Sequence, residues 1–128
     1  MRSSQQDLPV ALEDQHMGVA SRQAEWSDLN IALEKVPGGL DTAPIFRGLP
    51  DDRCQCPHWG YTIKGRFVVQ YRDREEVINA GDAYYLAPGH TCRFEEDTEL
   101  VEFSPKGEYQ KTIEVASRNT AAMPQAEG

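Results

Sequence analysis

Three side chains that can bind metal follow one another at alternate positions in the stretch Cys54-Gln-Cys56-Pro-His58. Successive side chains of an extended strand point to opposite faces, so Cys54, Cys56 and His58 would share one face. Two thiols and one imidazole at this spacing could converge on a single ion, and zinc accepts that ligand set. The stretch therefore indicates a metal site.

A second segment, residues 81–92, adds His90 and Cys92 just past a Pro-Gly turn. Ligands from two separate strands are what a closed metal site requires. Either His90 or Cys92 could be the fourth ligand, and His90 could instead be a general acid or base, since its ordinary pKa lies near neutrality. A simpler interpretation also stands: the cysteines are buried apolar groups and His58 is a core imidazole.

Short β-strands are expected to position these residues, because turn signals recur at intervals of about 8–12 residues. Leu29, Ile31 and Leu33 alternate with polar residues, as in a half-buried strand. The further expected strands cover residues 45–46, 54–63, 66–72, 76–79, 83–87, 91–94 and 100–103. About eight such strands predict an all-β sandwich or barrel.

The two ends of the chain lack this pattern. Residues 1–25 are rich in Gln, Ser, Asp and Glu without periodicity, which predicts a flexible N-terminal arm. Residues 106–128 are expected to form a C-terminal tail with a short helix near residues 109–118, although Ile113 and Val115 would fit a strand equally well. The barrel is thus assigned to residues 26–105, as one domain.

The composition excludes several classes of partner. The formal net charge is −8, from 21 acidic and 13 basic residues, so the chain is repelled by nucleic acid and by anionic membranes. No apolar run approaches the roughly 18 residues of a membrane span. The odd number of cysteines fits reduced thiols better than a disulfide framework. We therefore expect a cytoplasmic protein that binds neither nucleic acid nor a membrane.

Residues 54–92 resemble the two conserved motifs of the cupin superfamily. Tyr61-Thr-Ile-Lys-Gly65 is similar to the end of the first motif, and Gly81-Asp82 with a following apolar strand and Pro88-Gly89 is similar to the second. The likeness of turns and strand lengths extends over about residues 26–104. This resemblance implies a single jelly-roll β-barrel that encloses a small-molecule site, and it implies a homodimer.

The resemblance also bears on the metal. His58 falls where the family has Glu or Gln, Cys54 and Cys56 lie near the position of its His pair, and Cys92 stands at its final His. A thiolate-rich set favours zinc over iron.

The function expected from these residues is a cupin-domain protein that acts on or binds a small molecule. A divalent metal would be held by Cys54, Cys56, His58 and Cys92, with His90 as the catalytic residue. The alternative is a non-enzymatic cupin that binds or senses a small ligand, with a structural metal or with none.

Overall fold

The computed structural model describes residue 2 and residues 10–14 and 19–122 of the 128-residue chain. The strands are β1 (Val10–Asp14), β2 (Val19–Trp26), β3 (Leu29–Val36), β4 (His58–Lys64), β5 (Arg66–Gln70), β6 (Glu75–Asn79), β7 (Ala83–Leu86), β8 (Thr91–Phe94) and β9 (Thr98–Pro105). The helices are the 3-10 helices η1 (Ala43–Phe46) and η2 (Pro50–Asp52) and the α-helix α1 (Lys106–Ala122). Within this part of the chain, no helix is long and apolar enough to span a membrane.

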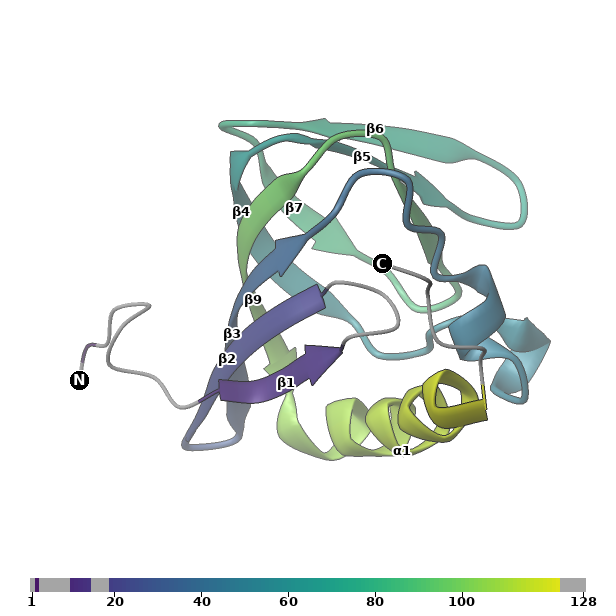
Figure 1. Cartoon of the computed structure of the whole chain (residues 1–128). Helices are drawn as coiled ribbons and strands as arrows, with labels where there is room; N and C mark the ends of the chain where they lie inside the picture. Colours follow the sequence, from purple (N-terminus) through teal and green to yellow (C-terminus); the bar gives the residue numbers. More distant parts are fainter. Residues whose placement is uncertain (1, 3–9, 15–18, 123–128) are drawn as a thin grey trace.

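Two antiparallel sheets form a jelly-roll barrel, which confirms the all-β expectation. The larger sheet has the order β1-β2-β3-β9-β4-β7, and the smaller has the order β6-β5-β8. Figure 1 shows the smaller sheet at the top of the barrel, α1 beneath, and the larger sheet curving along one side between them. Each neighbouring pair of strands in both sheets is antiparallel.

The apolar core lies between the two sheets and follows from the alternation of side chains along each strand. Phe67 stacks on Phe94 with ring centroids 5.0 Å apart, and it meets Tyr84 edge-on at 5.5 Å. Along β7 the alternation buries Tyr84 and leaves Tyr85 48% exposed, as expected for adjacent strand residues. Thus only one residue of this tyrosine pair points into the barrel.

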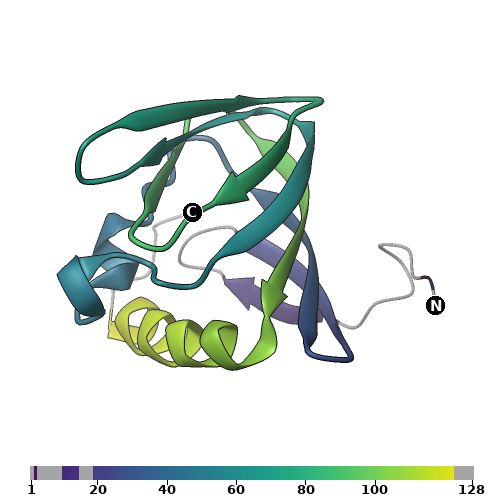
Figure 2. The same ribbon diagram turned by 180° about the vertical axis from the view of Figure 1, so that it is seen from behind.

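Helix α1 follows β9 directly and lies along the open side of the barrel, as Figure 2 shows from behind. It buries Thr112 and Ala116 against the barrel. The side-chain amide of Asn119 donates to the carbonyl oxygens of Ile45 and Arg47, both at 2.8 Å, and so ties the helix to η1. The C-terminal helix is therefore confirmed, and it is longer than the sequence indicated.

Two expected strands take a different form in the structure. The extended piece predicted at residues 45–46 is part of η1, whose first turn contains a proline that favours a helical start. The strand predicted at residues 54–63 begins only at His58, because Pro57 has no N–H to donate to a ladder. Cys54 and Cys56 therefore precede β4, although both are buried like His58, so the predicted extent of this strand is wrong.

The segment expected as a flexible arm is described in part. Residues 10–14 and 19–25 pair within the larger sheet as β1 and β2, where the sequence indicated an arm. The sequence of β2, VASRQAEW, has few large apolar residues and lacks the alternation that predicts a strand. It forms a strand because it pairs along its length with β3. Residues 1, 3–9, 15–18 and 123–128 lie outside the described residues.

Candidate metal centre and ligand cavity

Backbone pairing brings the two chemistry-bearing segments together. Cys54 and His90 form an isolated β-bridge, in which the Cys54 N–H donates to the His90 carbonyl at 2.9 Å. The Gly89 N–H in turn donates to the Cys54 carbonyl at 2.8 Å. Gly89 has a φ of 95°, a conformation that glycine adopts without steric cost. The Pro-Gly turn thus sets His90 beside Cys54, and His58 enters as the first residue of β4.

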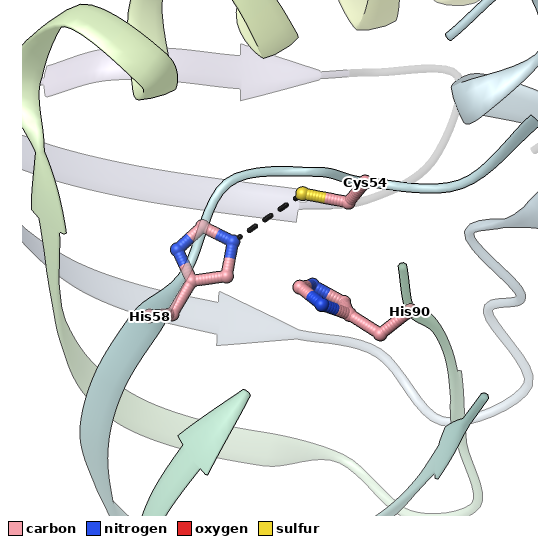
Figure 3. Close-up of side chains that lie close together, drawn as sticks. All are labelled: Cys54, His58 and His90. Atoms are coloured by element: carbon pink, nitrogen blue, oxygen red, sulfur yellow. Dashed lines mark hydrogen bonds between the residues drawn. The ribbon is translucent and has the colours of Figure 1, made fainter. Parts of the chain in front are cut away.

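Three ligand atoms meet at this point. The Sγ atom of Cys54 and one ring nitrogen each of His58 and His90 all lie within 4.8 Å of one another, and all three residues are buried. Figure 3 shows the three side chains, with Cys54 Sγ 3.5 Å from Nε2 of His58. This buried Cys/His/His group could hold a metal ion.

The other nitrogen of each imidazole is engaged. His90 Nδ1 donates to the Ala87 carbonyl oxygen at 2.7 Å, so its hydrogen sits on Nδ1 and the Nε2 lone pair is available. His58 Nδ1 lies 2.6 Å from the Ser104 hydroxyl and 3.6 Å from a Glu102 carboxylate oxygen. Partners of this kind fix ring orientation and tautomer around metal-binding histidines. The His90 ring is therefore held with its Nε2 lone pair available, and the His58 ring is held with Nε2 facing Cys54 Sγ.

Burial sets the charge of the three groups. It lowers the pKa of His58 to about 4, and burial together with the neighbouring His58 ring lowers the pKa of His90 to about 4. Both imidazoles are therefore neutral at pH 7. Burial raises the pKa of the Cys54 thiol to about 12, so this thiol keeps its proton unless a cation replaces it.

The other two predicted ligands lie elsewhere. Cys56 is fully buried in the bend before β4, and its thiol contacts the Pro57 carbonyl at 3.4 Å. Cys92 is packed in the apolar core between the sheets, where burial raises its pKa well above the usual value. Among the described residues, the ligand group contains neither of them, and it contains His90, which the sequence left open as ligand or catalyst.

A cavity of about 540 Å³ adjoins the three ligands, which form part of its wall. Both sheets, η1 and α1 line it, so the helix forms one side of a chamber inside the barrel. Most of the lining is apolar, with Val36, Leu40, Phe46, Leu86, Leu100 and Ile113 among its residues. This volume lies within the range of about 300–1,000 Å³ that is typical of small-molecule sites.

Two carboxyl groups also face this cavity. Glu34 on β3 and Glu102 on the neighbouring β9 both line it, and the Tyr84 hydroxyl donates to Glu102 at 2.9 Å. Burial raises the pKa of each carboxyl to about 7, and the nearby Glu102 charge contributes to the rise at Glu34. We did not predict either residue, although Glu34 stands two residues from Val36 on the inward face of a strand. The sequence signal for Glu34 is that a charged residue shares the inward face of its strand with the core residue Val36.

Comparison with known proteins agrees with the barrel described above. A family model for an AraC-like ligand binding domain matches residues 57–104, which is less than half of the chain. An RmlC-like cupin from Shewanella frigidimarina superposes with a TM-score of 0.59 at 15% identity, covering 81% of this chain and 88% of its own. The chain has the cupin fold.

Other solved structures share this cupin fold at low sequence identity. The polyketide cyclase RemF from Streptomyces resistomycificus has a TM-score of 0.60 and 15% identity, with 83% of this chain and 79% of RemF covered. The EutQ protein of Clostridium difficile has a TM-score of 0.56 and 10% identity, with 79% and 83% covered. No curated protein matches this chain in sequence. These likenesses establish the fold, and function must be argued from the site.

Proposed function

We propose that this cupin binds one divalent metal ion, zinc in preference to iron, through Cys54, His58 and His90, and that it acts on a small molecule held in the adjoining cavity. The observation that carries the proposal is the convergence of three buried ligand atoms within 4.8 Å at the wall of a 540 Å³ chamber. A bound metal ion would explain why these three side chains are buried side by side.

The distances support a tetrahedral ion. Zinc bonds of about 2.3 Å to sulfur and 2.0–2.1 Å to nitrogen, at a tetrahedral angle, place the two ligand atoms about 3.6 Å apart. The Cys54 Sγ to His58 Nε2 distance is 3.5 Å. One thiolate with two imidazoles is a soft to borderline donor set, which favours zinc over ferrous iron.

Three protein ligands leave a fourth tetrahedral position for water or substrate, which is the pattern of catalytic rather than structural zinc sites. The metal would supply Lewis-acid polarisation of a bound oxygen. Around it the chain's own residues have separate tasks. Ser104 orients His58, and α1 and the apolar wall limit the access of water. Glu102 lines the same cavity, 3.6 Å from His58 Nδ1, and is the candidate group to accept or return a proton.

The second candidate is a binding or sensing module that holds a ligand without transforming it. The match of residues 57–104 to an AraC-like ligand binding domain favours this candidate. The two candidates differ at the fourth position: a catalytic centre keeps it open, and a structural centre fills it. Adding imidazole to the cobalt(II)-loaded cupin would change the visible spectrum only if that position is open.

Elemental analysis of untagged cupin tests the metal directly. We expect about one zinc per chain, lost in Cys54→Ser and in His58→Ala, because each change removes one of three protein ligands. The matched controls are Cys56→Ser and Cys92→Ser, which change buried thiols outside the group and are expected to keep the ion. Absence of metal after anaerobic purification with added zinc and iron would contradict the proposal.

The homodimer implied by the family resemblance remains a prediction, as does a cytoplasmic location. The outer face of the larger sheet exposes Trp59 and Tyr85, which pair across β4 and β7 with ring centroids 5.3 Å apart. Light scattering of the purified protein would give its mass in solution.

A further inference from the structure

The cavity beside the proposed metal centre has side-chain charge of one sign only. Glu34 and Glu102 line it, and none of its described lining residues is Lys or Arg. The parts of the chain whose side chains are not described, residues 1, 3–18 and 123–128, contain no Lys or Arg either. Neither the described lining nor these segments therefore offer a Lys or Arg side chain to balance a negative charge inside the chamber.

This charge distribution disfavours anionic ligands. Moving an anion from water into an apolar cavity is costly unless a cation pairs with it. The one cation in the proposed site is the metal, whose charge is already opposed by the Cys54 thiolate and which would lie near the Glu102 carboxyl. A carboxylate or phosphate ligand would meet acidic groups and apolar walls.

The same groups suit a ligand that donates hydrogen bonds. Glu102 accepts from Tyr84 and lies beside His58, so it is committed to the metal side of the chamber. Glu34 lies one strand further from the ligands, on β3, opposite Ser21 in the register with β2. Its carboxyl faces the cavity and can accept a hydrogen bond from a hydroxyl or an ammonium group.

We propose that the cavity selects apolar molecules that carry no negative charge, and that Glu34 binds a hydroxyl or ammonium group of such a ligand. The volume of about 540 Å³ suits a molecule of the size of a fused-ring aromatic with short substituents. This inference rests on the proposed function, because it assigns a ligand class to the same cavity.

A matched series of three probes tests the ligand class on the full chain as purified. Naphthalenemethanol is neutral, naphthylmethylamine is cationic and naphthoate is anionic at pH 7, with the same ring body. Calorimetric titration should rank the alcohol and the amine at least about tenfold above naphthoate, because the anion would meet Glu34 and Glu102 with no Lys or Arg to pair with it. Equal or tighter binding of naphthoate overturns the proposal, and so does binding of none of the three at millimolar concentration.

The Glu34→Gln variant tests the residue. The amide keeps the size and one acceptor oxygen but loses the negative charge, so the amine should bind about tenfold more weakly while the alcohol changes by less than about threefold. Glu99→Gln is the control, because Glu99 pairs with Lys35 at the surface, and it should change neither affinity. Unchanged amine affinity in Glu34→Gln would show that Glu34 does not bind the donor group.

Failure of the metal proposal would be seen separately. Zinc content is measured on each sample used for the titrations, and Glu34→Gln is expected to keep its metal. The predicted probe ranking in a protein without metal would support the ligand class while contradicting the metal site. A zinc-containing protein that prefers naphthoate would support the metal site while contradicting the ligand class.

Discussion

At the scale of single residues, burial gives the three proposed ligands different proton requirements. The pKa of His58 and of His90 is lowered to about 4, so both rings already present neutral nitrogens at pH 7. The pKa of Cys54 is raised to about 12, so its thiol must lose a proton when a metal binds. Metal binding at neutral pH should therefore release one proton, and it should come from Cys54.

The apparent zinc affinity should accordingly rise about tenfold per pH unit between about pH 8 and 9, above the range in which Glu34 and Glu102 titrate. The measurement is competition with a chromophoric chelator at several pH values, corrected for the proton affinity of the chelator. In Cys54→Ser the remaining weak binding should lose most of this dependence, because a serine hydroxyl does not release its proton in that range. A slope near two in the native protein would show that a second ligand is protonated at neutral pH and would contradict the assignment.

The sequence identifies the side chains that could bind a metal, but it does not show which of them converge on one site. Cys54, His58 and His90 stand out by type, whereas the choice among five candidates depends on which atoms converge. Cys56 lies in the bend before β4 with its thiol outside the group, and Cys92 lies in the core between the sheets. Both outcomes depend on tertiary packing, which alternation along one strand does not specify.

At the scale of elements, close approach of β4 and β7 fixes the tyrosine that supports Glu102. A Cβ atom at Gly60 would lie 2.7 Å from the Tyr84 ring carbon Cε2 and closer still to the hydroxyl end of the ring. Tyr84 is buried and donates to Glu102 at 2.9 Å. Position 60 therefore admits only glycine without displacing this ring.

We expect Gly60→Ala to lower the free energy of unfolding by about 1–3 kcal/mol through overpacking against Tyr84. Gly107→Ala is the control, since a Cβ there meets nothing within 4 Å and the residue lies in the first turn of α1. That change should be neutral or stabilising by up to about 1 kcal/mol. Urea unfolding monitored by circular dichroism measures both. Equal stability of Gly60→Ala and the native protein would mean that Tyr84 is not held as described.

The strands with strong apolar alternation were the predictable elements. Those from β3 onward that carry such patterns, including β5 and β8, fall where the sequence indicated strands. Strand β2 and helix η1 were missed for a shared reason. Neither carries a periodic apolar signal of its own, and each is stabilised by a neighbour: β2 by its pairing with β3, and η1 by Asn119 of α1.

At the scale of the whole molecule, the buried acids and histidines give opposite dependences of stability on pH in the metal-free protein. A histidine whose pKa is lowered on folding contributes stability above its unfolded value near 6.5, and this is lost as pH falls toward 4. A carboxyl whose pKa is raised to about 7 contributes stability below about 4.5, which is lost as pH rises through 7. The two contributions oppose each other between about pH 4.5 and 6.5.

Glu34→Gln removes one raised carboxyl and should therefore stabilise the metal-free protein more at pH 8 than at pH 5. At pH 8 the native carboxyl is ionised in its buried position, whereas at pH 5 it is protonated in the folded state. Urea unfolding in the presence of a chelator at both pH values gives the difference, with Glu99→Gln as the surface control. A stabilisation that is equal at the two pH values, or larger at pH 5, would contradict burial of the Glu34 charge.

The most direct test of the central claim is the near-ultraviolet spectrum of the cobalt(II)-loaded protein. Coordination of Cys54 should give a thiolate-to-cobalt charge-transfer band at one cobalt per chain, because the thiol must bind as a thiolate. The band should be absent in Cys54→Ser and unchanged in Cys56→Ser and Cys92→Ser. A band that survives in Cys54→Ser, or that disappears in Cys92→Ser, would contradict the site formed by Cys54, His58 and His90.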